Sequence, residues 1–249
     1  QRLTALGADA MPMTPVELTR MGPTKQLGRY PMHWHMCRDG AAGQYIVESS
    51  IHETFNRACT IHGTDGILVD GNVGYHNLGH AFFLEDGSEE DNVLSNNLAI
   101  GTLKPAQSTN PVYDDAVIPS DNEFDQFQNR TPAAFWITNP RNTIVGNVAS
   151  DTIGTGFWLI FSRQVLGLSN PATSGSIPHN QNDQPNKLDL TEFRDNIAHG
   201  CRQGLDVHDG IEFGTDHILP NVSWAPASGV ATLNFFFNDS AATEIYTGD

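Results

Sequence analysis

The chain has 249 residues, of which 39% are hydrophobic, enough to bury a sizeable core. Thirteen lysine and arginine residues against 29 aspartate and glutamate residues give a formal net charge of −16, which argues against nucleic acid as a partner because phosphate contacts need basic patches. No apolar run reaches about 18 residues, so the sequence predicts no membrane segment in this chain.

A five-residue pattern recurs along the chain. It begins with a small residue and then alternates, and a proline replaces the small residue in the first copy. The copies are PMHWH at 31–35, ACTIH at 58–62, AFFLE at 81–85, AFWIT at 134–138, GFWLI at 156–160 and GLDVH at 204–208. One parity is apolar throughout: Met32 and Trp34, Cys59 and Ile61, Phe82 and Leu84, Phe135 and Ile137, Phe157 and Leu159, Leu205 and Val207. This period of two predicts strands whose apolar side forms the core.

A second pattern precedes the later five copies. It consists of an apolar residue, then a serine or asparagine three positions on, then another apolar residue. Its members are Val47, Ser50 and Ile51; Val69, Asn72 and Val73; Leu94, Asn97 and Leu98; Ile144, Asn147 and Val148; Phe193, Asn196 and Ile197. The pattern predicts a strand, a tight bend and a further strand. Asparagine suits the bend because it tolerates left-handed conformations and hydrogen-bonds the backbone of a neighbouring coil.

The spacing of the copies distinguishes two all-β folds. Equivalent positions lie 23 residues apart from Ala58 to Ala81 and 22 apart from Ala134 to Gly156. A β-sandwich also has short alternating strands, but it does not return the same residue types at this period, whereas a solenoid does. We therefore predict a right-handed parallel β-helix, one domain over 1–249, as a fragment of a longer chain. Its two loop insertions are 103–131 and 162–190, which are rich in proline, serine, asparagine and aspartate.

The opposite parity of the repeated strands faces outward and carries His33, His35, His62 and Glu85. Adjacent coils lie about 4.8 Å apart, so these four side chains are expected to converge on one patch. Three imidazoles and a carboxylate outline a metal site. Nearby histidines, His52, His76 and His80, are candidate neighbours of the ligands. A metal-free acid/base site at Glu85 or His62 and simply solvated histidines are the alternatives.

Aromatic residues continue this outward face as Phe83, Trp136 and Trp158. A row of exposed aromatics is typical of a binding surface, and flat apolar rings suit the faces of sugars. The alternative is that an insertion folds over these aromatic residues and buries them. The two interpretations are compatible if the insertions form the walls of a binding groove.

An acidic run follows at 85-EDGSEEDN-92. Such a run usually forms a solvated loop. Clustered oxygen ligands also suit Ca²⁺, although this run lacks the spacing of an EF-hand.

Several longer motifs carry a family resemblance. They are VELTRMG at 16–22, RYPMHWHM at 29–36, IHETFNRACTIHG at 51–63, GHAFFLEDG at 79–87, FWITNP at 135–140 and GTGFWLIF at 154–161. In this order they resemble the β-helix region of the cell-migration-inducing hyaluronidase and transmembrane protein 2 family, shared with fibrocystin-like proteins, over about 16–208.

The resemblance implies an extracellular or cell-surface β-helix, depolymerisation of hyaluronan by the hyaluronidase members, and a calcium requirement. It carries over His33, His35, His62, His80, Glu85 and Asp86 as site residues. The family's upstream G8 module and lectin-like domain are not in this chain. Fibrocystin-like members share the β-helix and are not established enzymes.

Two functions remain open on the sequence. The first is a hyaluronidase-like glycosidase acting on an acidic polysaccharide, with Glu85, His62 and Asp86 as catalytic candidates. A divalent ion, Ca²⁺ or Zn²⁺-like, would be held by His33, His35, His62 and His80, and substrate would be bound by Phe83, Trp136, Trp158 and Arg57. The second is a non-catalytic glycan-binding or adhesive solenoid. Three sequons, at Asn129, Asn221 and Asn238, would suit a secreted glycoprotein.

Overall fold

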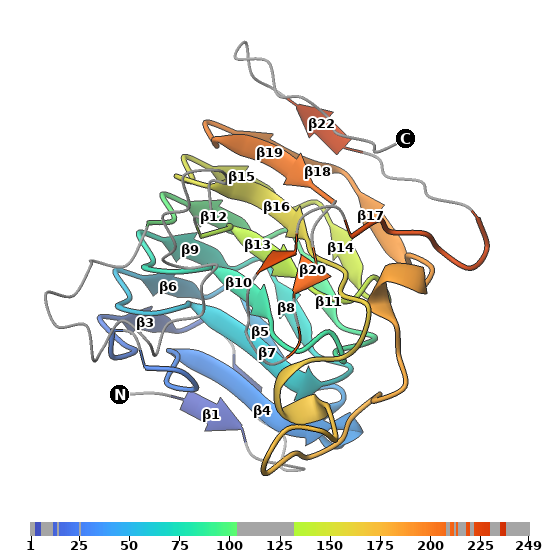
Figure 1. Ribbon diagram of the computed structural model, residues 1–249. Helices are drawn as coiled ribbons and strands as arrows, with labels where there is room; N and C mark the ends of the chain where they lie inside the picture. Colours follow the sequence, from blue (N-terminus) through green and yellow to red (C-terminus); the bar gives the residue numbers. More distant parts are fainter. Residues whose placement is uncertain are drawn as a thin grey trace, which may run out of the picture.

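In the computed structural model, the chain folds into stacked coils of short parallel strands (Figure 1). The structure describes residues 3–5, 12–13, 15–24, 26–103, 132–207, 210–211, 213, 218–219, 222–229 and 235–237. The predicted insertion 103–131, apart from Leu103, and the sequons at Asn129, Asn221 and Asn238 lie outside these ranges. Within them there is no α-helix, and no helix is long and apolar enough to cross a membrane.

Three parallel sheets run along the solenoid. In spatial order, the first sheet contains β1 (Leu3–Ala5), β4 (Met32–Arg38), β7 (Cys59–Thr64), β10 (Phe82–Leu84), β13 (Phe135–Ile137), β16 (Thr155–Leu159) and β19 (Gln203–Asp206). The second contains β17 (Glu192–Arg194), β14 (Thr143–Val145), β11 (Val93–Ser95), β8 (Leu68–Asp70), β5 (Tyr45–Val47) and β2 (Pro12–Met13). The third contains β22 (Phe235–Phe237), β18 (Asn196–His199), β15 (Val148–Ser150), β12 (Leu98–Ile100), β9 (Val73–Tyr75), β6 (Ser50–His52) and β3 (Glu17–Thr19).

Short elements outside the sheets complete the fold. They are an antiparallel pair, β20 (Gly210–Ile211) and β21 (Ile218–Leu219), and the 3₁₀ turns η1 (Asp39–Ala41), η3 (Gly167–Ser169) and η4 (Pro185–Lys187). The predicted parallel β-helix is confirmed, because every strand of the three sheets pairs in parallel with its equivalent one coil away.

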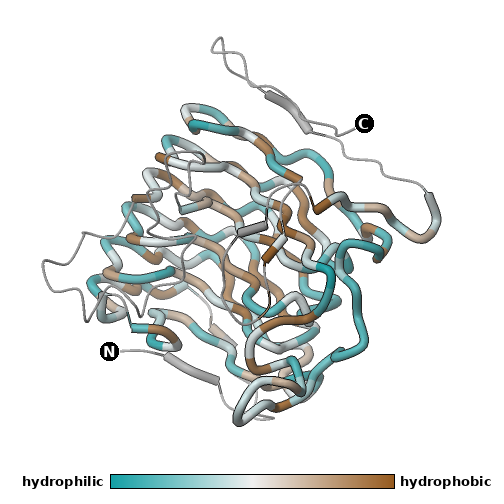
Figure 2. The backbone as a smooth tube through the Cα atoms, viewed as in Figure 1, coloured by the Kyte–Doolittle hydropathy of each residue, from teal (hydrophilic) through white to brown (hydrophobic). Residues whose placement is uncertain are grey.

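The predicted core parity is also confirmed. Phe82, Phe135 and Phe157 lie in register on β10, β13 and β16, are at most 1% exposed, and stack with ring centroids 5.0 and 4.6 Å apart. Leu84, Ile137 and Leu159 are equally buried. Figure 2 shows this pattern as hydrophobic strands inside and hydrophilic bends outside. The stacking follows from the fold, since each coil repeats the packing problem of the last.

Asparagines at one bend form the predicted ladder. Asn72 Nδ2 donates to Asn97 Oδ1 at 3.0 Å, Asn97 Nδ2 donates to Asn147 Oδ1 at 3.0 Å, and Asn147 Nδ2 donates to Asn196 Oδ1 at 3.1 Å. Each amide oxygen also accepts a hydrogen bond from a backbone N–H of the preceding coil; Asn72 N–H, for example, donates to Asn97 Oδ1. These buried side chains therefore satisfy one another and the bend.

The first coil differs from the prediction by one residue. Ile46, not Val47, pairs with Val69, and Ser49, not Ser50, precedes the ladder by donating its N–H to Asn72 Oδ1. Serine replaces asparagine there, so the sequence pattern that marks the bend elsewhere is missing from this coil.

Replacing Asn97 with alanine is expected to lower the free energy of unfolding by about 1–3 kcal/mol, because the buried N–H of Asn72 and the carbonyl of Val69 both lose a partner. Urea unfolding followed by circular dichroism measures the change. Replacing the exposed Asn96, one residue away, with glycine provides the control. It should change stability by less than about 0.5 kcal/mol, because Asn96 has a positive φ of 53° that glycine adopts without strain. Equal effects of the two substitutions would contradict a structural role for the ladder.

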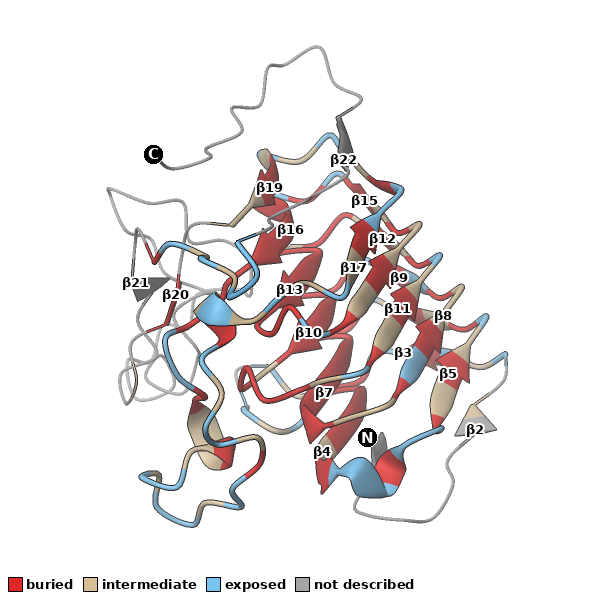
Figure 3. Cartoon of the chain, turned by 90° about the vertical axis from the view of Figure 1, so that its right-hand side faces the viewer, coloured by how far each residue is buried: buried red, intermediate tan, exposed pale blue. Residues whose placement is uncertain are grey.

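The insertion 162–190 packs on the outer side of the first sheet. Leu166 and Ser169 donate their N–H groups to Asp86, at 2.8 and 2.9 Å, and Ser88 Oγ lies 2.8 Å from Ser169 Oγ. Figure 3 shows the consequence: strands of the first sheet are buried on both faces, whereas those of the other two alternate. The insertion thus covers the face that carries the candidate site.

Candidate functional site

Three histidines gather on the outer face of β4 and β7. The ring centroids of His33 and His35 are 5.1 Å apart. The ring centroid of His62 lies 6.0 Å from that of His33 and 5.0 Å from that of His35. The cause is register, because His35 pairs with His62 across adjacent strands. Glu85, just beyond β10, adds a carboxylate, and one ligand atom from each of His33, His62 and Glu85 lies within 4.8 Å of the others.

His62 stands between two carboxylates. Its Nε2 is 2.8 Å from Asp86 Oδ2, and its Nδ1 is 3.4 Å from Glu85 Oε2. Burial by itself lowers the pKa of His62, but the negative charges of Asp86 and Glu85 outweigh that effect and raise the pKa to about 10. Without an ion, His62 is therefore a cation that neutralises part of this acidic pocket.

Glu85 is held from its other side by a tyrosine and an arginine. Tyr30 Oη donates to Glu85 Oε1 at 3.3 Å and accepts from Arg57 Nη1 at 3.1 Å, and the Arg57 guanidinium lies 3.9 Å from the Phe83 ring centroid. Burial raises the pKa of Glu85, while His62 and Arg57 oppose that rise. Arg57, predicted as a substrate-binding residue, is fully buried and contacts Tyr30 and Glu85, so the structure does not present it at the surface of the site.

The acidic run does not form the solvated loop that the sequence indicated. Asp86 and Glu89 are buried, at 2% and 0% exposure. Glu89 accepts the backbone N–H groups of Gly63, Asp86 and Gly87 at 2.8–2.9 Å, and burial and the charge of Asp86 raise its pKa to about 7. These contacts fold the run inward, where its carboxylates fix the turn that presents Glu85.

The donor set discriminates between metals. Ca²⁺ takes six to eight oxygen ligands, which two imidazoles and one carboxylate do not provide, whereas nitrogen and carboxylate donors suit Zn²⁺ and related ions. Ligating histidines usually have their second ring nitrogen bonded to a carboxylate or carbonyl. Both histidines fit this rule: His62 Nε2 faces Asp86, and His33 Nδ1 is 3.2 Å from the Gly28 carbonyl oxygen.

The remaining predicted histidines lie elsewhere. His80 is buried against Phe83 and Trp136, with ring centroids 5.2 and 4.5 Å away, and its Nδ1 accepts the N–H of Ala133. His52 lies on β6 in the third sheet, 2.8 Å from Glu17, and His76 stacks on Tyr75 beyond β9. The structure therefore does not bring His80, His52 or His76 into the group of His33, His62 and Glu85.

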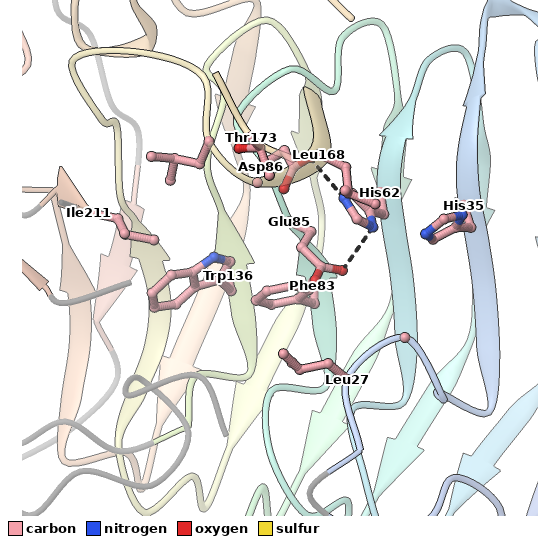
Figure 4. Close-up of a pocket in the computed structure, with 13 residues that line it drawn as sticks. Leu27, His35, His62, Phe83, Glu85, Asp86, Trp136, Leu168, Thr173 and Ile211 are labelled. Atoms are coloured by element: carbon pink, nitrogen blue, oxygen red, sulfur yellow. Dashed lines mark hydrogen bonds and ion pairs between the residues drawn. The ribbon is translucent and has the colours of Figure 1, made fainter. Parts of the chain in front are cut away.

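Phe83, Trp136 and Trp158 do form a row, but a buried one. They are 0–4% exposed and cluster with Leu166 of the insertion and with Ile211. Beside this row lies a pocket of about 350 Å³, between the first sheet and the insertion (Figure 4). Its lining comprises Leu27, Gly28, His35, His62, Phe83, Glu85, Asp86, Trp136, Leu166, Gly167, Leu168, Thr173 and Ile211. The insertion thus buries most of the aromatic row and also forms a pocket wall.

Sequence reasoning missed several of these contributors. Tyr30 bridges Glu85 and Arg57. It stands three residues before His33 in the 29–36 motif, and this proximity is the sequence feature that could have marked it as a site residue. Leu168 and Thr173 come from an insertion without periodicity, and nothing in their local sequence marked them as pocket residues.

Comparisons with known proteins give a consistent result. The family description CEMIP beta-helix matches residues 3–205. The chain is 38% identical to mouse fibrocystin-L over 184 residues and 36% identical to the human cell surface hyaluronidase CEMIP2 over 211 residues. It is 33% identical to the mouse cell migration-inducing and hyaluronan-binding protein over 226 residues. These matches cover 74%, 79% and 84% of this chain but 4%, 15% and 16% of the respective relatives.

Proposed function

The chain belongs to the CEMIP beta-helix family, and from this premise we propose that it is a hyaluronidase-like part of a larger extracellular or cell-surface protein. It would cleave a hexosaminidic bond of an acidic polysaccharide such as hyaluronan. The observation that carries the proposal is the convergence of His33, His62 and Glu85, of which His62 and Glu85 line a sugar-sized pocket. Relatives named as hyaluronidases support the substrate class.

His33, His62 and Glu85 would hold a divalent transition-metal ion, with Asp86 orienting His62 and the Gly28 carbonyl orienting His33. When bound, such an ion supplies positive charge that offsets the −16 of the chain and polarises a substrate or water oxygen. This role departs from the acid/base chemistry considered for Glu85 on the sequence, since an ionised ligand carries no proton.

Proton transfer then passes to His35. It lines the pocket, is half-buried, and its ring lies 5.0 Å from that of His62. Its imidazole reaches the pocket, and imidazole is the side chain that general acid–base catalysis uses most often. Phe83 and Trp136 would shape the opposite wall against the sugar, and the insertion would exclude bulk water.

Metal analysis paired with substrate profiling tests this function. The purified chain is expected to contain about one transition-metal ion and to shorten hyaluronan, measured by size-exclusion chromatography. Chelator treatment should abolish cleavage and Zn²⁺ should restore it, while Ca²⁺ alone should not. Chondroitin and alginate profile the substrate range. A metal-free chain that cleaves hyaluronan at the same rate with and without chelator would overturn the metal assignment.

A second function has one specific observation in its favour. Mouse and human fibrocystin-L match this chain at 38% and 37% identity, as high as the hyaluronidases do. A non-catalytic, glycan-binding solenoid would use the same pocket without bond cleavage. Retention of hyaluronan on the immobilised chain, with no change in its size, would favour this alternative.

A further inference from the structure

Asp86 decides which ring nitrogen of His62 is available to an ion. Asp86 Oδ2 lies 2.8 Å from His62 Nε2, and the other ring nitrogen, Nδ1, lies 3.4 Å from Glu85 Oε2 (Figure 4). A ring nitrogen that is hydrogen-bonded to a carboxylate cannot bind a metal at the same time, so Nδ1 is the nitrogen that can join Glu85 at the proposed ion. The position of the Asp86 carboxylate therefore sets the position of this ligand atom.

The same carboxylate fastens the insertion 162–190 to the first sheet. Asp86 Oδ2 also accepts the backbone N–H of Ser169 at 2.9 Å, and the Asp86 carbonyl oxygen accepts the N–H of Leu166 at 2.8 Å. One oxygen atom thus bonds a histidine of the β-helix and a turn of the insertion. Asp86 is 2% exposed, so a carboxylate displaced from this position would lose partners that water does not readily replace.

Gly167 stands between these two N–H donors in the sequence, and its lack of a side chain permits the contact. A Cβ atom added there would overlap Asp86 Oδ1 and lie 2.7 Å from Asp86 Cγ, closer than real Cβ atoms approach other atoms. The backbone φ of Gly167 is +49°, a left-handed conformation that glycine adopts without a steric cost. Any side chain at position 167 would therefore force the turn and the Asp86 carboxylate apart.

We propose that Gly167 is a positioning residue of the metal site. By admitting the Asp86 carboxylate against its backbone, it keeps Asp86 bonded to His62 and so fixes the Nδ1 ligand atom. The inference rests on the proposed function and adds that the insertion completes the metal site as well as covering it. The strands of the first sheet supply the ligands, and the turn at Gly167 supplies the constraint that orients one of them.

Gly167→Ala is expected to weaken Zn²⁺ binding by about 10–100-fold, the range for losing the partner that orients a ligating histidine. Competition with a chromophoric chelator measures the affinity. The absorption spectrum of the Co²⁺-loaded chain should also change, because the His62 ring no longer holds its position. Gly175→Ala provides the control, since Gly175 belongs to the same insertion and has a positive φ of 73°, but a Cβ atom there meets nothing within 4 Å. This variant should bind Zn²⁺ and Co²⁺ as the wild type does.

An Asp86→Ala background separates positioning from a general loss of stability. It removes the carboxylate that a side chain at position 167 would strike, so adding Gly167→Ala to it should change Zn²⁺ affinity by less than about twofold. An equal loss of affinity in both backgrounds, or an unchanged affinity of Gly167→Ala alone, would overturn the inference. A wild-type chain that binds neither ion would remove the metal site and the inference with it. A chain that binds Zn²⁺ and shows the expected losses, but leaves hyaluronan intact, would support the inference and contradict only the proposed cleavage.

Discussion

Replacing Phe157 with alanine is expected to lower the free energy of unfolding by about 3–5 kcal/mol, the range for deleting a fully buried aromatic side chain. Phe157 is 0% exposed, stacks on Phe135 at 4.6 Å and meets Phe193 edge-on at 5.7 Å. Denaturant unfolding measures the loss.

Phe55 is the control for that substitution. It is the same residue type in the same solenoid but is 44% exposed, so Phe55→Ala removes much less buried surface and should cost under about 1 kcal/mol. A neutral effect of Phe157→Ala, or one no larger than that of Phe55→Ala, would mean that the ring stack is not part of the stable core.

The register of the first sheet could be predicted because its strands alternate strictly. With the parity of Phe82 and Phe135 fixed, the parallel stack placed His62 beside His35, and the clustering of imidazoles followed without any tertiary information. The third sheet was harder to read. From β9 to β18 its inward positions are Gly74, Ala99, Ala149 and Ala198, because the aromatic stack fills the interior there and leaves room for small side chains. At β3 and β6, before that stack begins, the inward residues are Leu18 and Ile51.

Contacts between distant segments could not be predicted. Burial of Glu89 depends on three backbone N–H groups, one of them from Gly63 on the preceding coil, and no local pattern reports such a partner. The insertion 162–190 lacks periodicity, so its docking through Asp86 was equally hidden. The aromatic row shows the consequence. Trp136 was correctly predicted to point away from the solenoid interior, but it is buried because the insertion covers that face of the sheet.

The largest effect on the proposed chemistry is expected from His62. Replacing it with glutamine should remove bound metal and lower hyaluronan cleavage by at least about 100-fold, because one of three ligands is lost. Replacing Asp86 with asparagine should weaken metal binding by about 10–100-fold, since Asp86 orients the His62 ring at 2.8 Å. Metal content by mass spectrometry and the absorption spectrum of the Co²⁺-loaded chain report binding independently of activity.

His52 separates this effect from the loss of an ordinary histidine–carboxylate pair. Its Nε2 lies 2.8 Å from Glu17, the same distance as between His62 and Asp86, but the pair is on the third sheet, away from the pocket. His52→Gln should leave metal content, the Co²⁺ spectrum and cleavage unchanged. Should His62→Gln retain full metal content, the ion would have to bind elsewhere. Should the wild-type chain and His62→Gln both be metal-free while only the wild type cleaves hyaluronan, His62 would act through its own charge between Glu85 and Asp86.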